Sequence, residues 1–311
     1  MQRTLRFVIA ILLVATVDPV RSPMPLLVSA AAGAPSSGGS PTPARSQSQA
    51  QLRQASASSP SPDIPFPEYD SQAERQLLEL ANQARAAAGA PELAMDPGLS
   101  QAARAHAQAM FNAGQLSHQF ANEPSLAERL ASATRRQLDQ EAENVALDYD
   151  AAQGHEHLML SPPHRANLLN AAYNVAGMAV IRSGDRMYIV QDFGHALPTY
   201  SVDQARDKIA AAIAQARRSS IQPALTRREL ANADDAACSM AQADRLGTSS
   251  VQQLAQRYTV LTYTSLHPES LPDNAGPALA SHNLRSFSLG VCYARTQTYP
   301  TGVYWVVLAL E

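Results

Sequence analysis

The change from helical to strand-like periodicity between residues 68 and 198 constrains the fold most strongly. AERQLLELANQARAAAGAP repeats its apolar residues every three or four positions, which predicts an amphipathic helix. DPGLSQAARAHAQAMFNAGQ predicts another, because Asp96 can cap it and Pro97 suits its first turn. VAGMAVIRS and RMYIVQDFG are rich in β-branched residues and are joined by Gly184 and Asp185, so they predict an antiparallel hairpin. Helices followed by strands favour an α+β fold.

The first residues predict an export signal. The basic MQRTLR precedes FVIAILLVATV, an apolar stretch too short to span a bilayer comfortably. The chain turns polar and proline-bearing after Val17, which favours cleavage over the alternative of an uncleaved membrane anchor. We expect a signal peptide over residues 1–32 and no transmembrane span in the mature protein. The mature protein is then secreted, either extracellular or in the cell envelope.

The amino-acid composition divides the rest of the chain into a linker and a folded part. Residues 33–67 consist mainly of Ser, Pro, Ala, Gln and Gly, which predicts a disordered linker. The 311-residue length and the 45% apolar content leave room for two folded domains after it. The net charge is only -3 and the arginines are scattered, so we expect no nucleic-acid partner.

The second half repeats part of the first. IAQARRSSIQPAL, from Ile213, aligns without a gap with LANQARAAAGAPEL beyond its first residue. SLGVCYARTQTYPTGVYWVVLAL has the same glycine-led hairpin pattern as AGMAVIRSGDRMYIVQDFG. Residues 201–311 are therefore interpreted as a shortened duplicate, with chance alignment of alanine-rich helices as the alternative. His267 and His282 fall outside the repeated positions.

Three separate segments carry candidate site residues: LSHQF around His118, EAENVAL around Glu143, and MLSPPHRANLLN around His164. Their order and spacing, and the apolar hairpin that follows, resemble the CAP domain of cysteine-rich secretory proteins, antigen 5 and pathogenesis-related proteins, in its exported bacterial form. The resemblance implies a three-layer α-β-α sandwich over residues 68–198. The shortened duplicate then becomes a smaller, degenerate CAP-like α+β domain.

The candidate cleft residues have the chemistry of a metal site. Two neutral imidazoles and a carboxylate suit zinc or another divalent cation, with water completing the shell. His164 is expected in the first turn of a helix, where the dipole disfavours the imidazolium. We predict that the polar atoms of His118, Glu143 and His164 lie about 4 to 8 Å apart and open to one cleft. The alternative is a hydrogen-bonded polar cluster that pins loops over the sheet.

The sequence departs from the family's pattern of ligands. The resemblance implies a second glutamate, but Ser161 occupies the corresponding position. Glu156 lies one to two turns back, so Glu156 and Ser161 are carried as accessory candidates. Arg165 and Asn167 of the HRxNIL-like motif are expected to be structural ties. Ser161 is also expected to cap the helix that carries His164.

Other histidines are expected to play ordinary structural roles. His106 lies on the apolar face of a helix and is interpreted as a satisfied core histidine. His195 is interpreted as a loop residue. His155 and His157 are two residues apart on a predicted helix and point to different faces, so they cannot both chelate one ion.

The only two cysteines, Cys238 and Cys292, lie in the second half. An even pair in an exported protein predicts a disulfide with Cα atoms about 4.4 to 6.8 Å apart, although reduced buried thiols are the alternative.

The resemblance implies binding more than catalysis. We expect the cleft to bind a lipid, a glycan or another cell-envelope component. A metal-assisted hydrolase built on His118, Glu143 and His164 is the enzymatic alternative. A structural protein that docks to the cell surface is the third. The chain has no GxSxG, GxGxxG, P-loop or HExxH signature.

Overall fold

The computed structural model describes residues 13–15 and 68–311. Apart from Leu13–Ala15, the predicted signal peptide and linker lie outside the described residues. Within those residues, no helix is both long enough and apolar enough to cross a membrane.

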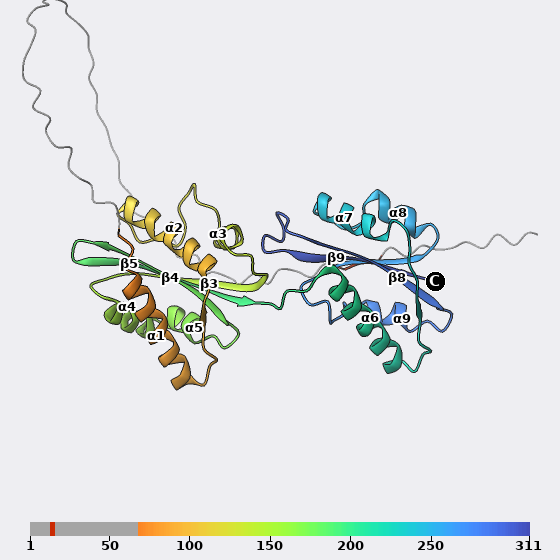
Figure 1. Cartoon of the computed structure of the whole chain (residues 1–311), viewed down its shortest axis with the longest axis horizontal. Helices are drawn as coiled ribbons and strands as arrows, with labels where there is room; N and C mark the ends of the chain where they lie inside the picture. Colours follow the sequence, from red (N-terminus) through yellow and green to blue (C-terminus); the bar gives the residue numbers. More distant parts are fainter. Residues whose placement is uncertain (1–12, 16–67) are drawn as a thin grey trace, which may run out of the picture. The chain divides into compact units, whose positions relative to one another are not determined.

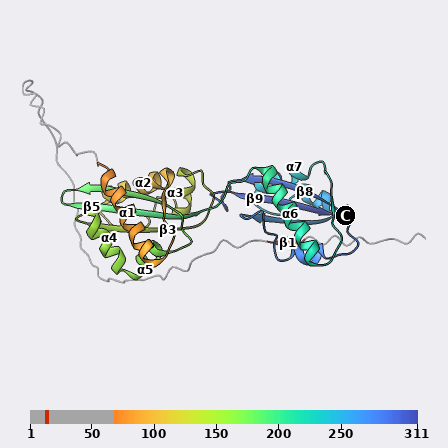
Figure 2. The ribbon, with the colours of Figure 1, turned by 60° about the horizontal axis from the view of Figure 1, so that its bottom comes forward.

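The first part of the fold is an α+β sandwich, as predicted. Its mixed sheet has the order β2-β4-β5-β3, in which β2 runs parallel to β4 and the other neighbours are antiparallel. The strands are β2 (Ala94–Met95), β3 (Leu138–Asp148), β4 (Val175–Ser183) and β5 (Arg186–Ala196). One face is covered by α1 (Ser71–Ala88), α4 (Ala151–Leu160) and α5 (Pro162–Leu169), and the other by α2 (Pro97–Ala113) and α3 (Leu126–Ala133) (Figure 1, Figure 2).

Alternation along the strands builds a core on each face of this sheet. On β4, Met178 and Val180 join the cluster that contains Leu77 of α1. Ala179 and Ile181, which point the opposite way, join the cluster of α2. Both faces of β4 and β5 are therefore apolar, which explains why these strands read as nearly continuous hydrophobic runs.

Several local predictions are confirmed. Asp96 caps α2 by accepting a hydrogen bond from the backbone N–H of Leu99 at 3.0 Å. β4 and β5 form the hairpin, and Gly184 at its turn has a φ of +63°, where glycine is favoured. The prediction that His195 lies in a loop is wrong, because β5 continues to Ala196 and His195 pairs with Gln140 of β3.

The second part is a small mixed sheet with the order β1-β7-β9-β8-β6. Its strands are β1 (Leu13–Ala15), β6 (Thr226–Arg227), β7 (Thr259–Ser265), β8 (Ser286–Ala294) and β9 (Val303–Leu310). Its helices are α6 (Val202–Ser219) and α9 (Ala275–Leu279) on one face, and α7 (Ala233–Ala243) and α8 (Ser249–Ala255) on the other (Figure 1). β1 lies within the predicted signal peptide, so cleavage would leave β7 as an edge strand.

A disulfide staples the second part. Cys238 on α7 bonds Cys292 on β8, and their Cα atoms are 5.1 Å apart, which confirms the predicted pairing. The bond closes a loop with a sequence separation of 54 residues. On the loop-closure estimate it stabilises the native state by about 4 kcal/mol.

Helix α2 rests directly on the sheet at Gly177. A Cβ added there would lie 2.1 Å from the carbonyl carbon of Leu99 and 2.3 Å from the amide nitrogen of Ser100. Both atoms belong to the backbone, so no side chain can move aside to make room. The absence of a side chain at Gly177 therefore sets the height of α2 above β4.

We predict that Gly177→Ala destabilises the protein by about 1–3 kcal/mol or more, because α2 must lift off the sheet. Gly276→Ala is the control, since a Cβ at Gly276 would meet nothing within 4 Å. Urea unfolding measures both variants. Equal stabilities for the two would show that α2 does not depend on this contact.

Candidate functional site

The candidate site is built around the edge strand of the first sheet. Glu143 on β3 lies directly opposite Asp192 on β5, and Gly177 on β4 lies beyond Asp192. All three face α2 and α3, because residues of the same parity on these strands join the core cluster of α2. Asn144, the next residue on β3, faces the other side, where its Nδ2 donates to the backbone oxygen of His164 at 3.1 Å.

The side chain of Glu143 is buried, and its carboxylate is surrounded by basic side chains. Arg129 of α3 donates through a side-chain nitrogen to its Oε2, and Nδ1 of His118 lies 3.0 Å from its Oε1. Nε2 of His106 lies 3.7 Å from the same oxygen. A buried carboxylate requires such partners, since an unpaired charge in the interior is costly. The electrostatics of the site therefore depend on α2, α3 and the loop between them.

His106 of α2 contacts the loop between α2 and α3 through both of its ring nitrogens. Its ring is fully buried, with Nδ1 2.7 Å from Oε1 of Glu123 and Nε2 2.8 Å from the backbone oxygen of Ser117. Each ring nitrogen therefore has an oxygen partner within hydrogen-bond distance. The interpretation of His106 as a satisfied core histidine is confirmed. Because it grips Ser117 and Glu123, it also orders the loop that carries His118.

Two imidazoles meet across the edge strand β3. The ring centroids of His118 and His164 are 6.3 Å apart, and the side chain of His118 is 45% exposed. His118 comes from the loop after α2, whereas His164 is the third residue of α5 on the opposite face. Burial, and then the electrostatic effect of the neighbouring His118, lower the pKa of His164, which favours the neutral ring. The contact between His118 and Glu143 is direct, closer than the predicted spacing.

The accessory candidates differ in their surroundings. Asn167 donates from Nδ2 to Oδ1 of Asn144 at 3.0 Å and so ties α5 to β3. Ser161 stands at the start of α5 but makes no capping hydrogen bond through its side chain, contrary to expectation. Arg165 and Glu156 are exposed, and neither side chain forms an ion pair or a hydrogen bond with the residues that the structure describes.

Sequence reasoning missed Asp192, Arg129 and Glu123. Asp192 is fully buried, and neither of its carboxylate oxygens has a hydrogen-bond donor among the described residues. Burial, and then the negative charge of Glu143, raise the pKa of Asp192 well above its ordinary value, so the neutral acid is favoured. The signal was present in RMYIVQDFG, where an acidic residue interrupts an otherwise apolar strand.

These side chains do not fit a divalent ion as they are arranged. Among residues 13–15 and 68–311, no group of three or more His, Cys, Asp or Glu is placed to hold a metal. Glu143 already contacts Arg129 and His118, so an ion there would have to displace a guanidinium. The expected zinc site is therefore not formed by this arrangement.

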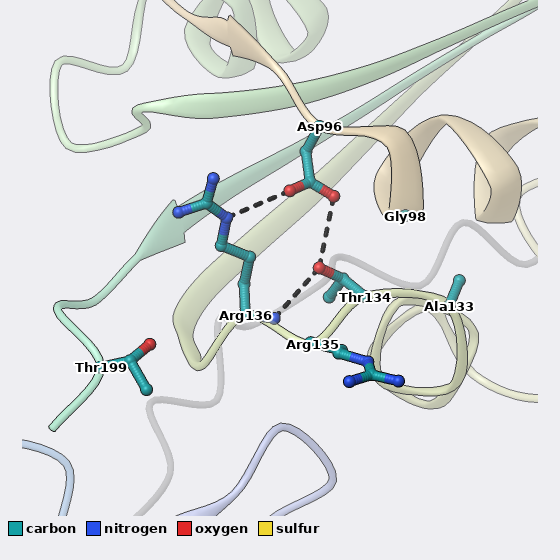
Figure 3. A pocket seen from close by; sticks show the side chains of 7 residues that line it. All are labelled: Asp96, Gly98, Ala133, Thr134, Arg135, Arg136 and Thr199. Carbon is teal, nitrogen blue, oxygen red and sulfur yellow. Dashed lines mark hydrogen bonds and ion pairs between the residues drawn. The ribbon is translucent and has the colours of Figure 1, made fainter. Parts of the chain in front are cut away.

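A separate hollow of about 340 Å³ lies at the start of α2 (Figure 3). Arg135 and Arg136 line it, together with Asp96. Asp96 accepts from Nε of Arg136 at 3.2 Å and from Oγ1 of Thr134 at 3.3 Å. Asp96, Thr134 and Arg136 therefore bond to one another, and none of the three histidine and glutamate candidates lines the hollow.

Comparison with known proteins identifies the class. Residues 78–193 match the cysteine-rich secretory protein (CAP) family, so this part of the chain is a CAP domain. A relative from Bacillus subtilis (strain 168), called an uncharacterized membrane protein, is 30% identical over 132 residues, 42% of this chain. The chain covers 37% of that relative's length.

Solved structures also resemble part of the chain. An extracellular protein containing an SCP domain from Bacillus anthracis is 24% identical, with a TM-score of 0.37 and coverage of 40% of this chain and 41% of that one. A cysteine-rich secretory protein from Staphylococcus aureus is 22% identical, with a TM-score of 0.33 and coverage of 40% and 38%. NaASP2 with Zn²⁺ is 14% identical, with a TM-score of 0.29 and coverage of 40% and 80%.

The protonated state of Asp192 predicts a pH dependence. A carboxyl group whose pKa is raised on folding binds its proton more tightly in the native state, so its contribution to stability is lost as pH rises above the ordinary aspartate value. Asp192→Asn removes this loss. The variant should gain stability relative to the wild type as pH increases from acid to neutral, measured by urea unfolding across that range. A relative loss with rising pH would mean that Asp192 is ionised in the native protein.

The contributions of Glu143 and Arg129 to the free energy of unfolding should be coupled, because the two side chains form an ion pair. Arg129→Met is predicted to destabilise the protein by about 3–5 kcal/mol because it leaves a buried carboxylate unpaired. Adding Glu143→Gln should recover much of that loss. Arg136→Met is the matched control, because Arg136 pairs with Asp96 while 54% exposed and should cost under about 1 kcal/mol. Additive losses in the double variant would refute the coupling.

Proposed function

We propose that this protein is an exported binding protein whose CAP domain, residues 68–198, recognises a hydroxyl-rich ligand such as a glycan of the cell envelope. The observation that carries the proposal is the accessible pair of imidazoles, His118 and His164, at the edge of the sheet. The predicted signal peptide supports export, as do relatives named as extracellular or secretory proteins.

The chemistry of the pair favours hydroxyl groups. Nδ1 of His118 lies 3.0 Å from the Glu143 carboxylate, which leaves Nε2 free to contact a ligand. The pKa of His164 is lowered, first by burial, and its neutral ring both donates and accepts. Neighbouring hydroxyls of a sugar match this alternation of donors and acceptors. The hollow in Figure 3 is lined largely by polar residues, which argues against an acyl chain there.

The hydrolase alternative has less support. A general base needs a free, suitably basic group beside the substrate. Glu143 is tied to Arg129, and Asp192 is buried with its proton retained. These contacts support a positioning role, rather than a catalytic one, for the carboxyl groups beside the imidazole pair.

We predict that His118→Ala with His164→Ala weakens binding to purified cell-wall glycan by about tenfold or more, the loss of one or two hydrogen bonds with their desolvation cost. His157→Ala is the control, because His157 pairs with Asp148 and makes no contact with this pair. Isothermal titration of the full chain measures the affinity. Titrations with Zn²⁺ and with phospholipid vesicles run in parallel. Unchanged glycan binding in the double variant, or binding to Zn²⁺ or vesicles alone, would overturn the proposal.

We also infer that residues 201–311 are a degenerate second CAP-like unit. Supporting this, the order β7-β9-β8-β6 corresponds strand by strand to β3-β5-β4-β2, with the same parallel and antiparallel neighbours. Gly290 approaches the backbone of Ala233 as Gly177 approaches Leu99. Arg217 donates to the carbonyl oxygens of Pro223 and Leu279, as Arg85 does to Pro91 and Leu168.

If the two units correspond in this way, the strand register supports the loss of the site from the second unit. The row Gly177, Asp192 and Glu143 corresponds to Gly290, Val307 and Thr262. Seven residues after the glycine contact, Met240 stands where the first unit has His106. The buried ionic cluster is replaced by uncharged side chains. We therefore assign binding to the first unit alone and a structural role to the second.

A further inference from the structure

Histidines outside the imidazole pair gather around one aspartate, Asp139. Its Oδ1 lies 2.7 Å from Nδ1 of His195, and its Oδ2 lies 3.5 Å from Nε2 of His267. Nδ1 of His267 in turn lies 3.4 Å from Oε1 of Glu269. Asp139 and His195 belong to the CAP domain, whereas His267 and Glu269 follow β7. We call these four residues the latch cluster.

The backbone of β3 is irregular at this point. Leu138 pairs with Ala196 and Gln140 pairs with His195, so Asp139 is an extra residue in a β-bulge. A bulge redirects a side chain that a regular strand would place by simple alternation. Here the redirected carboxylate meets an imidazole from each part of the chain. The bulge and the two contacts are independent observations that point to the same role.

His267 lies between two carboxylates. Its Nε2 is 3.5 Å from Oδ2 of Asp139 and its Nδ1 is 3.4 Å from Oε1 of Glu269, which are ion-pair distances. These contacts are attractive between opposite charges only when the ring carries a proton on each nitrogen. We propose that Asp139, His195 and His267 form a proton-dependent latch that holds the C-terminal unit on the CAP domain and loosens when the imidazoles lose their protons.

The other charged groups around the latch cluster are acidic. Glu141 lies close enough to Asp139 for that carboxylate to raise its pKa, after the larger effect of desolvation. The pKa of the Tyr304 phenol is raised, mainly by burial, and the negative charge of Glu269 contributes to this shift. Among the described residues, no lysine or arginine forms an ion pair with Asp139 or Glu269. Protons on His195 and His267 are therefore the positive charge available to balance this acidic group.

Neighbouring contacts between the same parts do not titrate near neutral pH. Nε2 of Gln137 donates to the backbone oxygen of Gly302 at 3.0 Å, and Oγ1 of Thr301 donates to that of Leu138 at 2.9 Å. Arg295 donates to the backbone oxygens of Ala131 and Thr134. These bonds supply a constant attachment, to which the latch adds a part that depends on pH.

Hydrogen exchange of the full chain tests the latch. Amides in residues 131–139 and 299–303 should be about two- to fivefold better protected below the ordinary histidine pKa of about 6.5 than above it, after correction for intrinsic exchange, as expected for part-exposed ion pairs. Asp139→Asn and His267→Gln should each remove this difference, and the double variant should lose nothing more.

His282→Gln is the matched control, because His282 is an exposed histidine of the same unit outside the latch cluster. Unfolding curves show whether each variant retains the wild-type fold, and Asp139→Asn preserves side-chain size if His267→Gln does not fold. A pH difference that persists in both latch variants, that is missing from the wild type, or that disappears equally in His282→Gln would refute the latch. The outcome does not depend on what His118 and His164 bind.

Discussion

The site depends on keeping the carboxylate of Glu143 charged inside the protein. Burial of an ionised carboxyl group is costly, and the protein offsets this cost with Arg129 and with His118 at 3.0 Å. Each partner comes from a different element: Arg129 from α3 and His118 from the loop before it. Asp192, directly opposite, is the group that gives up its charge. One residue on an edge strand thus determines where a helix and a loop must lie.

That arrangement requires α2 to lie close to the sheet. His106 reaches Glu123 and Ser117 from α2, and Gly177 permits the backbone of α2 to touch β4. On the opposite face, the buried guanidinium of Arg85 donates to four backbone oxygens and joins the end of α1 to the segment after α5. α5 carries His164. The imidazole pair is therefore positioned from both layers, although neither histidine belongs to the sheet.

The sequence predicted most of the frame but only part of the site. Helical spacing, the Asp96 cap and the Gly184 turn are local signals, so they identified α2 and the β4–β5 hairpin. Contacts between distant residues leave no such signal. Arg129 and Glu123 look like ordinary surface charges of a helix and a loop, and only the fold brings them to Glu143. His195 was misjudged because β5 extends past the glycine that seemed to end it.

The second sheet has close backbone contacts like those of the first sheet, but it lacks acidic residues in the row that corresponds to Glu143 and Asp192. Gly290 on β8 lies against the backbone of α7, Arg217 is buried and donates to backbone oxygens, and a disulfide from α7 to β8 adds a covalent tie. Thr262 and Val307 stand where Glu143 and Asp192 stand in the first sheet. Uncharged residues in that row avoid the cost of burying charge, so such a sheet forms without an ionised carboxylate in this row. In the first sheet, the ionised carboxylate of Glu143 is buried at an energetic cost. Its contact with Nδ1 of His118 holds that ring near His164 at the exposed edge of the sheet, which packing of apolar side chains would not do.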